Sequence, residues 1–186
     1  MNKKIRVTIN YDAANYSEDQ GRRFSDFFGA KFETSSNKVY RFAEIPPPII
    51  EMVVNLSNLV DTSVKSGVGL GIGFAISKHL LSRIIDDLYG GVKKLISAAF
   101  KTKSGKEPVI LISLIYKDVV IKASLPKGDV SEKTNSIKNL YAISDEAVEK
   151  TKILGLRGSI ILFSHFENGK WIIKRAENSD GESVDF

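Results

Sequence analysis

Apolar and polar positions alternate in several short stretches of the chain, a pattern typical of β-strands with one buried face. Residues 4–11 alternate isoleucine, valine and tyrosine with polar side chains, and residues 38–45 and 119–125 give two further candidate strands. Residues 109–116 are apolar at every position except Ser113. Such continuous apolarity predicts a strand buried on both faces, near the middle of a sheet.

Helical periodicity indicates a short helix near the N-terminus. Ser17 and Gln20 form a capping-box pair, which marks a helix start. Phenylalanines follow at helical spacing, and they predict either a core stripe, which we favour, or an aromatic binding face. They are Phe24, Phe27, Phe28 and Phe32.

Two longer apolar segments predict a helical hairpin. Prolines 46–48 suit the start of a helix over residues 48–65, and residues 74–100 show a continuous amphipathic stripe. Residues 66–73 are rich in glycine and separate the two segments. Gly90-Gly91 is expected to kink or split the second helix.

The C-terminal third predicts a helix in two pieces and then a hairpin. Residues 131–154 read as helical with a break near Ser144, and strands 159–167 and 170–176 flank Asn168-Gly169. Asn-Gly is the preferred two-residue turn with both residues at positive φ. Two cross-strand pairs follow from this turn, Glu167 with Lys170 and Phe166 with Trp171.

These elements together predict an α+β fold. We expect a mainly antiparallel sheet, with the long helical hairpin and shorter helices packed on one face. Residues 1–176 are expected to form a single domain, and residues 177–186 an acidic, flexible tail.

Composition restricts the available chemistry. The 186-residue chain has no cysteine, which excludes disulfides, thiolate zinc sites and a cysteine nucleophile. The histidines are His79, on the flank of an amphipathic helix, and His165, in the final hairpin opposite Ile172. The adjacent carboxylates of Asp86 and Asp87 point in different directions from a helix and therefore make a poor cation site. We therefore expect no cofactor, no metal and no assigned catalytic residue, and an enzyme using His79 or His165 ranks third among the functions considered.

Charge is unevenly distributed along the chain. The last ten residues hold four acids and no base, which leaves 27 basic and 18 acidic residues in positions 1–176, a net charge of +9. A basic segment without acids is either a solvated helix end and loop or a patch that attracts nucleic acid or anionic lipid. Its members are Lys93, Lys94, Lys101, Lys103 and Lys106. The N-terminus resembles no secretory signal, which favours a cytoplasmic location, with attachment to the inner membrane face as an extension.

The glycine-rich stretch allows several interpretations. It lacks the glycine spacing and the preceding strand of a dinucleotide fingerprint. It resembles the ATP-lid glycines of sensor histidine kinases, but the Asp-x-Gly-x-Gly box of that family does not occur in the chain. Two Gly-x-x-x-Gly pairs are typical of close helix packing, either within the fold or at a membrane or partner surface. The residues proposed for contact are Gly67, Gly69, Gly71, Gly73 and Phe74.

Residues 38–123 resemble the effector-associated constant component family of bacterial conflict (defence) systems. The features that carry the resemblance are a strand ending in Pro46–Pro48, an apolar helix, the glycine-rich break, a second apolar helix and the strand pair 109–116 and 119–123. The resemblance implies a non-enzymatic component that accompanies an effector or sensor. The first hypothesis is therefore an interaction module whose helical hairpin contacts a protein partner, another copy of the chain or an anionic membrane surface. Nucleic-acid binding through the basic segment is the alternative.

Overall fold

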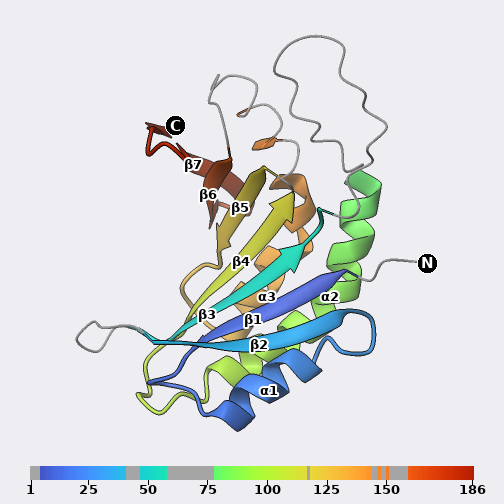
Figure 1. Ribbon diagram of the computed structural model, residues 1–186, viewed down its shortest axis with the longest axis vertical. Helices are drawn as coiled ribbons and strands as arrows, with labels where there is room; N and C mark the ends of the chain where they lie inside the picture. The colour runs from blue at the N-terminus through green and yellow to red at the C-terminus, as the bar shows by residue number, and fades with distance from the viewer. Residues whose placement is uncertain are drawn as a thin grey trace.

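The computed structural model describes residues 5–40, 47–57, 78–116, 118–143, 146–147, 150 and 159–186. Within these ranges, eight strands form one sheet in the order β2-β1-β3-β4-β5-β6-β7-β8. They are accompanied by helices α1, α2 and α3, by one 3-10 helix and by further helical residues at 143, 146, 147 and 150 (Figure 1). The glycine-rich stretch lies outside the described residues, as does most of the segment between β3 and α2.

The elements have the following bounds. The strands are β1 Arg6–Asp12, β2 Glu33–Val39, β3 Ile49–Asn55, β4 Val109–Tyr116, β5 Val119–Ser124, β6 Ile160–Glu167, β7 Lys170–Asn178 and β8 Ser183–Asp185. The helices are α1 Glu18–Asp26, α2 Lys78–Ala99, α3 Val130–Lys138 and the 3-10 turn Leu140–Ala142.

The α+β class is confirmed, but the sheet is mixed and not mainly antiparallel as predicted. Three neighbouring pairs are parallel (β1/β2, β3/β4 and β5/β6), and the other four are antiparallel. Each parallel pair is separated in sequence by a segment that contains a helix, because parallel neighbours need a long crossover connection. The periodicity of the sequence indicates the helices but not the parallel pairing of the strands that flank them.

The predicted helix over residues 48–65 is wrong where the structure describes it, because residues 49–55 form β3. Side chains of β3 alternate between buried and half-buried, with Ile50, Met52 and Val54 facing the core. Isoleucine and valine favour strands, and here this preference and the period of two prevail over the proline signal. A long helical hairpin is therefore not present among the described residues.

The predicted strand at residues 38–45 overlaps β2 only at its end. β2 is made mainly of polar residues, and it lies at the edge of the sheet, where none of its side chains is buried. An edge strand of this kind lacks the apolar alternation from which strands are recognised.

The amphipathic helix is confirmed as α2, and it runs without interruption through Gly90-Gly91. Its stripe packs on the core face of the sheet. The fully buried members are Leu81, Ile84, Ile85, Leu88, Val92, Leu95, Ile96 and Ala99.

The helix near the N-terminus is also confirmed, together with its capping box. Ser17 Oγ accepts from the Gln20 N–H, and Gln20 Oε1 accepts from the Ser17 N–H. Of the four phenylalanines, Phe24, Phe28 and Phe32 are buried in the core and Phe27 packs against it. The core interpretation is therefore confirmed.

The final hairpin has the predicted turn and register. Asn168 has φ 51° and Gly169 has φ 78°, Glu167 faces Lys170, and Phe166 lies 5.4 Å from Trp171 between ring centroids. Residues 177–186, for which a flexible tail is expected, contain the end of β7 and the whole of β8.

Replacing Gly169 by alanine should lower the free energy of unfolding by about 1 kcal/mol, because an L-residue is strained at this positive φ. The Cβ would meet no neighbouring atom, so the cost is conformational. Urea unfolding followed by circular dichroism would measure it. An unchanged midpoint would contradict the turn geometry.

Candidate interaction face

The sheet has two unlike faces. One packs against α1, α2 and α3 and holds the core, whereas no described helix covers the other, which faces the viewer in Figure 1. We call this second side the open face. Its apolar side chains come from β3, β4, β5, β6 and β7, and all are half-buried. They are Ile49, Val53, Val109, Leu111, Ile115, Val120, Ile161, Phe163 and Ile172.

The apolar side chains gather most closely across β4, β5 and β6. Ile115 pairs with Val120 across one antiparallel ladder, and Val120 pairs with Ile161 across the next, parallel ladder. Because side chains at paired positions lie on the same face, these three form a continuous aliphatic row. Phe163 lies two residues along β6 on the same face, so it extends this row into a patch.

A hydrogen-bonded polar cluster lies beside the patch. Ser113 Oγ donates to Glu51 Oε1 at 2.6 Å, and Asn10 Nδ2 donates to Glu51 Oε2 at 3.2 Å. Both carboxylate oxygens of Glu51 are therefore engaged, by side chains from β4 and β1. The cluster fixes a negative charge on the open face and links three neighbouring strands through their side chains.

Lys122 places a positive charge close to this cluster. It is the cross-strand neighbour of Ser113, and its Nζ lies 6.0 Å from the ring centroid of Phe163, within the range of a cation–π contact. The open face thus combines an aliphatic patch with the charges of Glu51 and Lys122. The ion pair of Arg175 and Glu177 borders the patch on β7, beside Phe163 and Ile161.

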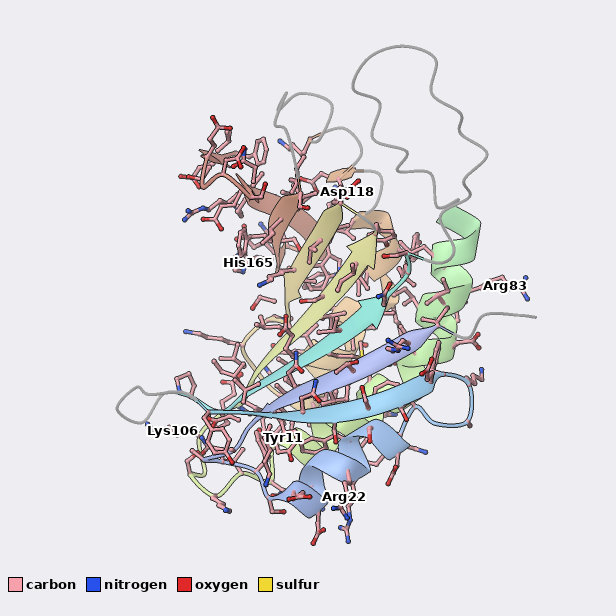
Figure 2. All side chains as sticks on the ribbon, in the orientation of Figure 1. Tyr11, Arg22, Arg83, Lys106, Asp118 and His165 are labelled. Carbon is pink, nitrogen blue, oxygen red and sulfur yellow. The ribbon has the colours of Figure 1, made fainter. Side chains whose placement is uncertain are left out.

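The arrangement does not match a nucleophilic site. Ser113 donates to the Glu51 carboxylate but is only 2% exposed, so its hydroxyl is not accessible to a substrate. His165 is exposed on the same face, near the C-terminal end of β6, where it pairs with Ile172 (Figure 2). In the described ranges, no three His, Asp or Glu side chains gather in a way that could hold a metal ion.

The predicted basic residues are all exposed. Lys93 and Lys94 lie on α2, and Lys101, Lys103 and Lys106 lie in the loop from α2 to β4. Backbone groups anchor this loop next to α1. The Lys103 N–H donates to the Asn15 carbonyl at 3.4 Å, and Gln20 Nε2 donates to the Lys101 carbonyl at 3.1 Å. Lys93 also lines a cavity of about 490 Å³ between α2 and α3.

The other predicted contact residues are not described. Gly67, Gly69, Gly71, Gly73 and Phe74 lie outside the described residues, and so does the side chain of His79. The open face itself was missed because residues 49–55 were interpreted as helical. The signal that would have found it is Glu51, a single acid inside an apolar run, which marks the outward side of a strand.

No protein-family model, curated protein or solved structure matches this chain. Among the described helices, none combines the length and the apolarity needed to cross a membrane.

Proposed function

We propose that this chain is a non-enzymatic interaction module that binds a partner protein through the open face. The observation that carries the proposal is the aliphatic row Ile115, Val120 and Ile161 on an uncovered sheet face. Contiguous apolar surface of this kind, bordered by polar groups, is typical of protein–protein contact sites. The polar cluster around Glu51 supplies fixed hydrogen-bonding groups that select the partner's orientation.

The chemistry of the face favours protein over lipid or nucleic acid. Inserting it into a bilayer would move Glu51 and Lys122 out of water, which is costly for ionised groups. Glu51 would also repel phosphates, and only Phe163 is available there for stacking on bases. A protein surface, in contrast, can match an apolar patch and both charges at once.

The resemblance to the effector-associated constant component family agrees with this proposal. It implies a component of a bacterial defence system that accompanies an effector or sensor. On this basis the partner is a protein encoded next to the chain in its genome, and the module acts in the cytoplasm.

The test uses purified products of the neighbouring genes and isothermal titration calorimetry. Ile161→Lys introduces a charge into the aliphatic row and should raise the dissociation constant by about tenfold or more. Thr8→Lys is the matched control, because Thr8 lies on the polar β1 side of the same face, and its effect should be several-fold smaller. Equal effects of the two variants, or no binding of any product, would contradict the proposal.

Nucleic-acid binding remains a second candidate, since all five predicted lysines are exposed. The combined variant Lys101→Ala, Lys103→Ala and Lys106→Ala should then abolish binding of a single-stranded 20-mer in low salt. Affinity that falls steeply with salt and is insensitive to Ile161→Lys would favour this function over the first. Anionic vesicles of phosphatidylserine and phosphatidylcholine serve as the lipid comparison in the same assay.

A further inference from the structure

The two edges of the sheet differ in a way that points to a partner strand. One edge is β8, which has only three residues, all exposed. The other is β2, with seven residues in unbroken register with β1 and without proline. Short edge strands, bulges and prolines are common means of preventing edge-to-edge pairing. β8 follows this practice. β2 is neither short, bulged nor interrupted by proline, and its one lysine, Lys38, is held at 2.9 Å by Glu18 of α1.

The direction of the β2 backbone groups follows from its hydrogen bonds. The Glu33 N–H donates to the Ile5 carbonyl at 3.0 Å, and the Val39 carbonyl accepts from the Ala13 N–H at 3.1 Å. In a parallel ladder, alternate residues bond to the same neighbour, so odd-numbered residues of β2 bond to β1. The N–H and C=O groups of Thr34, Ser36 and Lys38 therefore point away from the sheet.

Space is available along this edge. A cavity of about 570 Å³ lies between α1 and β2, lined by Tyr11, Glu18, Arg22, Ser36, Asn37 and Lys38. Tyr11 and Arg22 lie at this end of the molecule in Figure 2. Directly after β2, the side chain of Tyr40 is 71% exposed, which is the largest value among the exposed large hydrophobic residues of the described chain.

We propose that β2 pairs antiparallel with β2 of a second copy of this chain, around a two-fold axis at Ser36. Such an axis is perpendicular to the sheet, so the open faces of the two copies lie on the same side. Each residue pair across the axis then joins two even-numbered or two odd-numbered residues. Ser36 then pairs with its own copy and Thr34 with Lys38 of the second copy. The outward N–H and C=O groups of one copy bond to those of the other.

This register also places Tyr40 opposite Phe32 of the second copy. Phe32 is buried on the face of the sheet that packs against the helices. Tyr40 is also even-numbered, so its side chain projects from the same face. Dimerisation would thus cover the exposed Tyr40 of each copy, at the two ends of the paired strands.

The charged residues of α1 in one copy are complementary to those of α1 in the other copy in this arrangement. Glu18 and Arg22 form an ion pair at 2.8 Å and are both more than half exposed beside the edge. The two-fold axis brings two α1 helices side by side in antiparallel orientation. Glu18 of one copy then lies toward Arg22 of the other, an opposite-charge contact that favours a second copy over an unrelated strand.

Sedimentation velocity of the 186-residue chain over a range of concentrations tests the proposal. The wild type should show a concentration-dependent monomer–dimer equilibrium. Ser36→Pro removes one outward N–H at an edge position where proline is tolerated, and should weaken the dimer at least about tenfold. Ser36→Ala keeps the N–H and should dimerise like the wild type, because the bond belongs to the backbone.

A second variant makes the result independent of any folding defect in Ser36→Pro. Tyr40→Asp alters an exposed residue beyond the strand, so the fold should persist while the dimer dissociates. A wild type that stays monomeric at all concentrations, or a dimer unaffected by Tyr40→Asp, would overturn the proposal. Ile161→Lys should leave dimerisation unchanged, which separates this result from the test of the open face.

Discussion

Glu107→Gln should lower the free energy of unfolding by about 2 kcal/mol, because it leaves the buried ammonium group of Lys133 without an anion. Lys133 is 1% exposed, and its Nζ donates to Glu107 Oε1 at 2.8 Å and to the Pro126 carbonyl at 2.5 Å. The Glu107 side chain is 42% exposed, so water screens part of the effect. Urea unfolding at neutral pH would measure the change.

The matched control is Lys133→Met, which removes the ammonium group but keeps most of the buried side-chain volume. The free carboxylate of Glu107 would then be solvated, so we expect a smaller loss, about 1 kcal/mol. Adding Glu107→Gln to Lys133→Met should cost little more. If Glu107→Gln alone were the milder of the two single changes, the ammonium group would not be the group that requires compensation.

The same ion pair predicts a dependence on pH. Lys133 and the Gly128 N–H both bond to Glu107 and lower the pKa of its carboxyl group from 4.5. A lowered folded-state pKa means that the stabilisation is fully present above the unfolded pKa and is lost as pH falls through the folded one. The stability difference between wild type and Glu107→Gln should therefore shrink below pH 4.5. A difference that stays constant into strong acid would contradict this.

Gly91→Ala should destabilise the protein by about 2 kcal/mol, the usual scale of an overpacked core. A Cβ at Gly91 would lie 2.5 Å from two ring carbons of Phe28 and 3.0 Å from the Phe27 carbonyl oxygen. The ring of Phe28 is buried and the carbonyl belongs to the backbone, so neither moves aside easily. Thermal or urea unfolding would show the loss.

Gly90→Ala is the control for this prediction. A Cβ at Gly90 meets no atom within 4 Å, so only the gain in helix propensity remains. We expect an increase in stability of about 0.5–1 kcal/mol. Two adjacent glycines in one helix should thus respond with opposite signs. Equal responses would mean that α2 does not approach Phe28 as closely as described.

The features predicted correctly from the sequence are those with a strong local cause. The Asn168-Gly169 turn, the Ser17 capping box and the α2 stripe each depend on residues close in sequence, and local patterns are enough to identify them. The prediction was wrong at β3 because a segment of seven residues, five of them apolar, is too short to distinguish a strand from a helix. What decides is pairing with β1 and β4, which lie far along the chain.

The candidate site was less predictable than the fold. Glu51 lies 41 positions from Asn10 and 62 positions from Ser113, and no spacing rule connects the three residues of this cluster. The same holds for Lys133, whose partner Glu107 is 26 positions away. Its burial could not be inferred from a lysine in an apparently polar helix.

The order of the strands also has a consequence for how the molecule folds. Six of the seven neighbouring strand pairs join strands that are consecutive in the chain, and only β1 and β3 pair across an intervening strand. Contacts between nearby segments form faster than distant ones because less chain entropy is lost. Sequence separation is largest between β3 and β4, where Ile49 pairs with Val109, so β1–β3 and β4–β7 are expected to form first and to join last along the β3/β4 ladder. Pulsed hydrogen exchange should then show amides of the β4/β5 ladder protected earlier than those of the β3/β4 ladder.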